Sequence, residues 1–210
     1  MLRILIADDH AIIRKGLKQI LLEEYPFAII EEVSDAEGVM KKIISNEWNI
    51  IICDISMPGR SGLDVLQEVK QNFPKLPVLI LSIHPEEQYA IRVLKAGAAG
   101  YLSKDVATEE LVKAVQRVLE GHKYISPLLA ERIAEDLGNN NSDKTPHEFL
   151  SDREFEVFKL IASGEAVSKI AEKLSLSSTT VSTYRLRILI KMNLKTNAEL
   201  IRYALQNKFI

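Results

Sequence analysis

Five polar or charged side chains, far apart in the sequence, could together carry out phosphoryl chemistry. Each ends or follows a short apolar run: Asp8, Asp9, Asp54, Ser82 and Lys104. Converging carboxylates repel one another unless a hard divalent cation shares them. Mg²⁺ prefers oxygen ligands and fills its shell with waters and phosphate oxygens, while a lysine and a hydroxyl can hold the remaining phosphate oxygens. The set therefore predicts phosphoryl transfer onto a carboxylate, with Asp54 as the nucleophile.

The same residues have simpler explanations when each is considered alone. An Asp-Asp pair after a strand usually caps a helix, and a single lysine is usually solvated. A site is favoured because all five groups fall at strand ends, where open parallel sheets bind their ligands. His10 and His84 flank the set, but Mg²⁺ seldom uses imidazole. Cys53 precedes Asp54 in the same strand, so its side chain is expected on the opposite face, in the core.

Apolar runs that alternate with amphipathic segments supply the elements that would position these groups. We expect strands at 2–7, 27–33, 49–53, 77–82 and 99–102, and helices at 11–24, 35–46, 61–72, 86–96 and 107–121. Apolar residues recur at three- and four-residue steps in the helices, and the first, third and fourth strands are nearly continuous Ile, Leu and Val. Five strand-then-helix units predict a doubly wound α/β domain with a five-stranded parallel sheet.

The pattern changes after residue 121. A further short helix is expected at 126–137, followed at 138–146 by a polar stretch with helix breakers, which is typical of an interdomain linker. Four helices and no strands follow, at 151–163, 167–174, 178–192 and 196–206; Ser151 and Glu154 form a capping-box pattern at the first. The predicted organisation is a first domain at 1–121, a short helix and linker at 122–148, and a small all-α domain at 149–210.

Composition narrows the class of protein. Of 210 residues, 47% are hydrophobic, which is enough for a core. No apolar run is long enough to span a bilayer, and the first one leads directly into Asp8 and Asp9, unlike a secretory signal. Cys53 is the only cysteine, so a disulfide framework is excluded. We expect a cytoplasmic protein with no membrane partner.

Charge is distributed unevenly along the chain. Residues 1–148 carry 17 Lys and Arg against 23 Asp and Glu, a net charge of −6, whereas residues 149–210 carry ten against six, a net charge of +4. This asymmetry suggests a basic nucleic-acid-binding module joined to an acidic regulatory one.

Residue detail around the acidic set resembles a response-regulator receiver domain. The resemblance rests on Asp8-Asp9-His10, Asp54-Ile55-Ser56-Met57-Pro58-Gly59-Arg60-Ser61-Gly62, Ser82 and Tyr101-Leu102-Ser103-Lys104. It covers about residues 1–121 and implies a flavodoxin-like fold, a sensor histidine kinase as partner and Mg²⁺ as cofactor.

The resemblance also implies a role for each matching residue. Asp54 would be the phosphoacceptor, Asp9 a direct Mg²⁺ ligand and Asp8 an acid that acts mainly through water. The backbone carbonyl of Ser56 would complete the metal set.

Three further residues would respond to the phosphate. Lys104 would pair with it, Ser82 would be the switch hydroxyl, and Tyr101 would be the aromatic side chain that swings inward when that hydroxyl engages the phosphate.

The helices expected at 167–174 and 178–192 have the proportions of a helix-turn-helix, although most helix pairs do not bind DNA. If Val181 faces the core, a step of 100° per residue returns Ile188 and Met192 to the core. The opposite face, available to a major groove, then carries Thr179, Ser182, Thr183, Leu186 and Arg187.

Residue detail resembles the LuxR-type helix-turn-helix over about residues 149–208. The matching segments are Leu150 to Val157, Ile170 to Leu174, and Ser178-x-x-Val181 with Lys191-Met192. Double-stranded DNA is the implied partner, and we predict contacts from Ser178, Thr179, Ser182, Thr183, Arg187, Lys195 and Thr196. This chain has Ser182 and Tyr184 where many members have Lys and His, so base preference cannot be transferred from the family.

The order of the two modules resembles the NarL/FixJ group of response regulators. It implies that phosphorylation of Asp54 controls sequence-specific DNA binding and transcription. A Mg²⁺-dependent phosphohydrolase with an accessory helical domain is the alternative, but it needs a general acid beside its nucleophile, and we find none near Asp54. An apolar stripe in the last helix (Leu200, Ile201, Ala204 and Leu205) could form a homodimer when the protein is phosphorylated or DNA-bound, or could complete the domain's own core.

Overall fold

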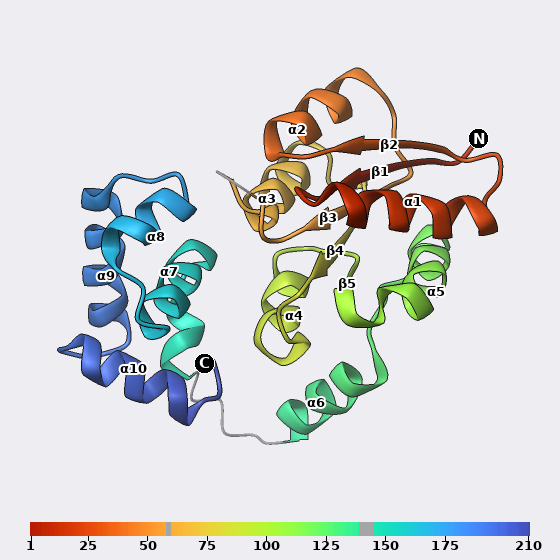
Figure 1. Cartoon of the computed structure of the whole chain (residues 1–210). Coiled ribbons are helices and arrows are strands. Elements are labelled where there is room, and N and C mark those ends of the chain that lie inside the picture. The colour runs from red at the N-terminus through yellow and green to blue at the C-terminus, as the bar shows by residue number, and fades with distance from the viewer. Residues whose placement is uncertain (58–59, 139–144) are drawn as a thin grey trace. The chain divides into compact units, whose positions relative to one another are not determined.

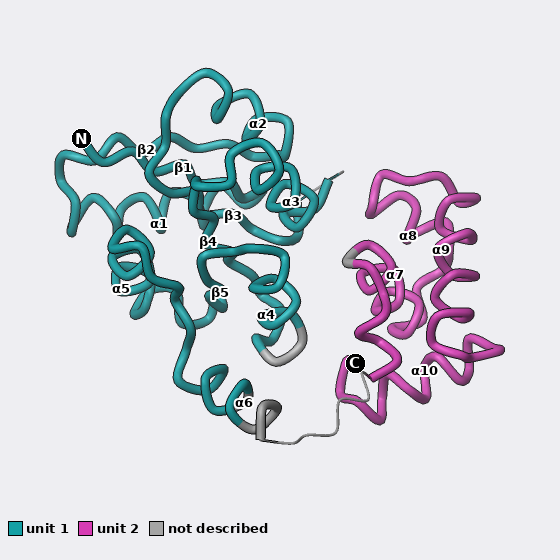
Figure 2. Tube along the Cα trace, turned by 180° about the vertical axis from the view of Figure 1, so that it is seen from behind, with its two compact units in different colours: residues 1–138 teal, residues 139–210 magenta. Residues whose placement is uncertain are grey.

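The structure is a computed structural model that describes residues 1–57, 60–138 and 145–210. It divides into two compact units, Met1–Gly138 and Asn139–Ile210 (Figures 1 and 2). Most of the stretch predicted to be a linker, at 139–144, lies outside the described residues. No helix in the described part of the chain combines the length and apolarity that a membrane crossing requires.

A five-stranded parallel sheet forms the centre of the first unit, which confirms the predicted fold class. Its strands lie in the order β2-β1-β3-β4-β5 and comprise β1 (Arg3–Ala7), β2 (Ile29–Val33), β3 (Ile50–Asp54), β4 (Val78–Ser82) and β5 (Gly100–Ser103). The intervening helices are α1 (Ala11–Glu24), α2 (Ala36–Ser45), α3 (Gly62–Asn72), α4 (Glu86–Lys95) and α5 (Ala107–Leu119).

The sheet is covered on both faces. Helices α1 and α5 pack together on one face, as do α2 and α3 on the other (Figure 1). Alternate strand residues such as Ile50 and Ile52 belong to the α1–α5 core. Cys53, between Ile52 and Asp54, is fully buried, as expected for a core residue.

Strand register brings the carboxyl ends of four strands to one level. Ala7 pairs with Cys53, so Asp8 follows β1 beside the position of Asp54. Asp54 pairs with Leu81, one residue before Ser82. Ser82 in turn pairs with Ser103, directly before Lys104. Residues separated by almost a hundred positions therefore meet at one edge of the sheet.

Capping residues explain why several helices begin one residue later than their sequence patterns suggest. Ser61 caps α3 and forms a capping box with Asp64, and Asp35 accepts a hydrogen bond from the Gly38 amide at the start of α2. These residues have extended backbones and belong to the preceding loop.

A sixth helix, α6 (Pro127–Gly138), packs against α4 within the first unit. Leu129 is 1% exposed, and the Ser126 hydroxyl donates a hydrogen bond of 2.6 Å to a Glu86 carboxylate oxygen at the start of α4. The predicted short helix is therefore attached to the first unit by both apolar and polar contacts.

The second unit consists of helices, as the sequence predicts. It contains α7 (Asp152–Ala162), α8 (Val167–Lys173), α9 (Ser178–Lys191) and α10 (Asn197–Gln206), preceded by a 3₁₀ turn, η2 (Pro146–Phe149). Phe209 packs edge to face against Phe155 and Phe158 in its core, and the Tyr203 hydroxyl lies 2.8 Å from Nδ1 of His147.

The predicted capping box at α7 is confirmed, and its buried Glu154 also pairs with the partly exposed Lys191. Glu154 is 3% exposed; its Oε2 accepts hydrogen bonds from the Ser151 amide at 2.7 Å and from Nζ of Lys191 in α9 at 2.6 Å. Burial alone would raise the pKa of Glu154, but the hydrogen bonds from Lys191 and Ser151 hold that pKa below its ordinary value of 4.5.

Glu154→Gln is expected to lower the stability of the second unit at neutral pH by about 1–2 kcal/mol, because it removes charge-assisted hydrogen bonds. A carboxyl whose pKa is depressed on folding stabilises the fold above its unfolded pKa and loses that contribution as pH falls through the folded value. The difference between wild type and Glu154→Gln should therefore shrink below about pH 4.5. Hydrogen-exchange protection of the α7 and α9 amides, corrected for intrinsic exchange rates, measures this stability difference at each pH.

The matched control is Glu165→Gln. Glu165 pairs with Lys173, whose side chain is 59% exposed, and exposed ion pairs contribute little. An equal loss of protection in both variants, or a pH-independent loss in Glu154→Gln, would contradict the assigned role of Glu154.

Candidate functional site

Lys104 joins two buried carboxylates at the carboxyl edge of the sheet. Its Nζ lies 2.6 Å from Oδ2 of Asp8 and 2.9 Å from Oδ2 of Asp54, and both aspartates are 1% exposed. Asp9, from the β1–α1 loop, has a side chain that is 32% exposed and lies 2.7 Å from Nδ1 of His10. The structure thus assembles Asp8, Asp9, Asp54 and Lys104 into one cluster, which we call the acid pocket.

The acid pocket fits a small divalent cation. One ligand atom from each of Asp8, Asp9, His10 and Asp54 lies within 4.8 Å of the others. Ligands that share one Mg²⁺ at about 2.1 Å lie up to about 4.2 Å apart, so a small contraction would bring the carboxylates into range. Oδ1 of Asp54 is buried and accepts no well-formed hydrogen bond within the described residues, so it is left for a cation or a phosphorus atom. The Ser56 carbonyl remains a predicted ligand.

Burial and the neighbouring charges have opposing effects on the pKa values in the acid pocket. Burial raises the pKa of Asp54 above its ordinary value, while the hydrogen bond and charge of Lys104 oppose that rise and the charge of Asp8 adds to it. Burial alone would lower the pKa of Lys104, but hydrogen bonds to Asp8 and Asp54 outweigh it and raise that pKa. The lysine therefore stays charged, and its ammonium group lies beside the Asp54 side chain.

The two predicted switch residues both hold the β4–α4 loop through His84. The Ser82 hydroxyl is fully buried and accepts a hydrogen bond of 3.1 Å from the His84 amide. The Tyr101 hydroxyl donates one of 2.7 Å to the His84 carbonyl. Tyr101 is 1% exposed, so the ring already lies inward in this structure. The movement of Tyr101 on phosphorylation remains a prediction.

Gly62 has a steric reason to be glycine. A Cβ at this position would lie 2.0 Å from the carbonyl oxygen of Asp54, while the Gly62 amide donates a hydrogen bond of 2.8 Å to Ile55. The loop after β3 therefore turns back directly against the backbone of the acid pocket.

Gly62→Ala is expected to destabilise the first unit by several kcal/mol, because the backbone itself must move. Gly16→Ala is the matched control: nothing lies within 4 Å of its added Cβ. In the interior of α1 that change should stabilise by about 0.5–1 kcal/mol. Thermal unfolding followed by Trp48 fluorescence separates the two. A midpoint for Gly62→Ala at or above that of wild type would refute the close approach.

Helix α9 presents its predicted DNA-contacting side chains to solvent. Val181 and Ile188 are fully buried and Met192 is 3% exposed, which confirms the predicted core face. Ser177 caps the helix, and the predicted contacts on α9 (Ser178, Thr179, Ser182, Thr183 and Arg187) are all exposed. Their role in DNA binding remains a prediction.

The last two predicted contacts lie at the start of α10. Thr196 caps this helix by accepting a hydrogen bond from the Glu199 amide, and the Lys195 amide donates to a Glu199 carboxylate oxygen at 2.7 Å. Arg185 of α9 donates a hydrogen bond of 2.6 Å from Nε to Oδ1 of Asn197, which joins the two helix segments. The side chain of Lys195 is exposed.

Most of the apolar stripe of α10 serves the unit's own core. Leu200 and Ala204 are fully buried, whereas Leu205 is 59% exposed. Leu200 and Ala204 of the stripe are therefore buried within the unit, and Leu205 is exposed.

Comparison with known proteins agrees with this arrangement. A family model described as "Response regulator receiver domain" matches residues 4–116, and one described as "Bacterial regulatory proteins, luxR family" matches residues 148–204. The chain belongs to the response regulators. It has the receiver domain followed by the LuxR-type helix-turn-helix that characterises the NarL/FixJ group.

Similarity to individual response regulators extends over the whole chain. The chain is 36% identical to the oxygen regulatory protein NreC of Staphylococcus carnosus (strain TM300), over 100% of this chain and 99% of NreC. It is 32% identical to the response regulator UvrY of Escherichia coli (strain K12), over 99% and 95% of the two chains. It also resembles RcsB of Salmonella enterica serovar Typhimurium, solved bound to the promoter rprA in the presence of phosphomimetic BeF3⁻, with a TM-score of 0.64, 26% identity and 97% and 98% coverage.

Sequence reasoning named the chemical groups of this response regulator but missed the groups that hold them. His84 is a shared partner of Ser82 and Tyr101 because of the geometry of its loop. Hydrophobic periodicity in the sequence does not predict loop geometry. The link from Ser126 to Glu86 was missed for the same reason. Gly62 lay inside the quoted motif, and its spacing after Asp54 was the available signal for a tight backbone approach.

Proposed function

We propose that this chain is a two-component transcription regulator in which phosphorylation of Asp54 controls sequence-specific binding to double-stranded DNA. The observation that carries the proposal is the buried Asp8–Lys104–Asp54 arrangement in the same chain as an exposed LuxR-type recognition helix. The phosphoryl donor is a sensor histidine kinase. A regulator that acts on chromosomal DNA works in the cytoplasm.

Asp54 accepts the phosphoryl group from a phosphohistidine of the kinase. A carboxylate oxygen of Asp54 attacks phosphorus, an O–P bond forms as the N–P bond breaks, and the imidazole nitrogen takes up a proton. Asp8, Asp9, Asp54 and the Ser56 carbonyl would hold Mg²⁺, which would neutralise negative charge on the phosphoryl oxygens. Lys104 is already beside Asp54 and pairs with the phosphoryl group without moving far.

The β4–α4 loop carries the signal away from Asp54. To donate to a phosphoryl oxygen, the Ser82 hydroxyl turns toward the acid pocket and weakens its contact with the His84 amide. His84 is also held by Tyr101, and its ring stacks on Tyr89 of α4 at 4.7 Å. A shift of this loop therefore changes α4 together with α6, which is bonded to it through Ser126.

DNA binding belongs to the second unit. We propose that the predicted contacts on α9 face the major groove, while Lys195 and Thr196 contact phosphate. RcsB, solved on a promoter with a phosphomimetic, supports the same use of this module here. Two copies pair on DNA as a homodimer, and the exposed Leu205 is available to that contact.

Incubation with Mg²⁺ and acetyl phosphate distinguishes a regulator from the alternative, a Mg²⁺-dependent phosphohydrolase. A regulator becomes labelled once per chain and releases phosphate slowly. Turnover of many phosphate esters per chain, with no stable label, would instead favour the hydrolase. The match to a regulatory family supports the first outcome.

A further inference from the structure

A row of methyl-bearing side chains runs along the exposed face of α9. It consists of Thr179, Thr183, Leu186 and Ile190, which we call the methyl stripe. Leu186 is 58% exposed and Ile190 is 69% exposed, although both are large and apolar. Spacings of four, three and four residues place them on one line of the helix, opposite the buried Val181 and Ile188. The fold of the unit leaves this row uncovered.

The hydroxyls near the methyl stripe already have partners for their hydrogens. Oγ of Ser182 donates to the Ser178 carbonyl at 2.9 Å, and Oγ1 of Thr183 donates to the Thr179 carbonyl at 3.0 Å. A base acceptor would have to compete with these bonds inside the helix. Apolar contact with a base is therefore more favourable in the middle of this face than a hydrogen bond from Ser182 or Thr183.

DNA, and not a second protein chain, fits the surroundings of the methyl stripe. Basic residues Arg185, Arg187 and Lys195 occur on α9 and the loop after it, within a segment of net charge +4. The helix begins with an exposed run of hydroxyl residues at the positive end of its dipole. A second copy of such a basic surface would be repelled, whereas a polyanion is attracted. The apolar group that a major groove offers is the C5-methyl of thymine.

We infer that Leu186, together with Thr183, reads thymine by methyl contact in the major groove; this rests on the proposed DNA-binding function. A recognition helix contacts base edges with its N-terminal residues. Leu186 lies seven residues, or about 10 Å along the helix, from Thr179, whereas Ile190 lies about 16 Å from Thr179, near the C-terminal end of α9. Leu186 is thus a specificity-determining residue, and Ile190 is its matched control.

The experiment begins by selecting a preferred duplex from a random pool with the full chain treated with Mg²⁺ and BeF3⁻. Each thymine of that duplex is then replaced singly by deoxyuridine, which removes only the methyl group. Fluorescence anisotropy measures the affinity of wild type, Leu186→Ala and Ile190→Ala for every duplex. One or two positions should weaken wild-type binding about fourfold, the effect of one buried methyl group.

In Leu186→Ala the weakening at one of those positions should disappear, while Ile190→Ala should keep the wild-type pattern. If wild type binds DNA specifically but tolerates every deoxyuridine, or if Leu186→Ala keeps the full pattern, the methyl-contact inference is wrong and the proposed function stands. If no sequence is selected at all, the proposed DNA-binding function fails. Dimerisation of free wild type that Leu186→Ala abolishes would assign the stripe to a second copy and also overturn the inference.

Discussion

Asp54→Asn is expected to abolish phosphoryl labelling while leaving the first unit folded. Asn keeps the shape of the side chain but removes the nucleophilic oxygen. Burial disfavours the charge of Asp54 and raises its pKa, so an uncharged side chain at this position should not lower the unfolding midpoint. Incubation with labelled acetyl phosphate and Mg²⁺, followed by hydroxylamine treatment, measures the acyl phosphate directly.

Asp105→Asn is the control for that experiment. Asp105 follows Lys104 in the chain, but its side chain is exposed and lies outside the acid pocket, so labelling should match wild type. A hydroxylamine-stable label that persists in Asp54→Asn would place the phosphoryl group on Ser or Thr and would contradict the assignment of Asp54.

Arg187→Ala and Lys195→Ala are expected to weaken DNA binding in different ways. Loss of a base contact by Arg187 costs about 1–3 kcal/mol and relaxes specificity at one position. Loss of a phosphate contact by Lys195 weakens all sequences alike and reduces the slope of log affinity against log salt by about one. Affinity titrations between about 50 and 200 mM salt, on the selected duplex and on an unrelated one, measure both effects.

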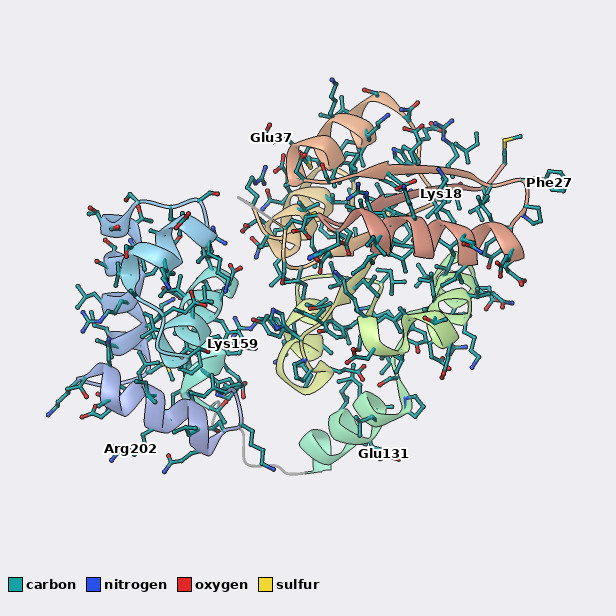
Figure 3. The ribbon with its side chains drawn as sticks, viewed as in Figure 1. Lys18, Phe27, Glu37, Glu131, Lys159 and Arg202 are labelled. Atoms are coloured by element: carbon teal, nitrogen blue, oxygen red, sulfur yellow. The ribbon has the colours of Figure 1, made fainter. Side chains whose placement is uncertain are left out.

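Arg202→Ala provides a charge-matched control. Arg202 is an exposed residue of α10 outside the predicted contact set, and Figure 3 shows its side chain extending into solvent. The Arg202→Ala change should alter neither the salt dependence of DNA affinity nor the sequence specificity. If Lys195→Ala altered sequence preference but left the salt slope unchanged, the division between base and phosphate contacts would be wrong.

The fold could be predicted from sequence because its signals are local. Buried parallel strands appear as continuous apolar runs, and helices appear as repeats of three and four residues, so all five strand-helix pairs were found. Boundaries differed by one or two residues, because capping residues such as Ser61 directly adjoin the helical pattern but have extended backbones. The 3₁₀ turn at Pro146–Phe149 was missed, since short turns carry no periodicity.

The acid pocket was accessible to sequence reasoning for a different reason. In an open parallel sheet every strand ends at the same edge, so a list of strand ends is already a list of neighbours. The strand register then places the side chains of Asp8 and Asp54 within hydrogen-bond range of Lys104. Contacts made by loops, such as those of His84, depend on tertiary packing and could not be found in this way.

Phosphorylation at Asp54 is expected to change the affinity of the chain for DNA, and a single titration measures that change. The selected duplex is titrated with full-chain wild type and Asp54→Asn, each with and without acetyl phosphate and Mg²⁺. Wild-type affinity is expected to rise about 5- to 150-fold on phosphorylation, the usual range of coupling between two sites. Asp54→Asn should remain at the unphosphorylated value. Equal affinity of wild type in both conditions, or an equal rise in Asp54→Asn, would contradict the account.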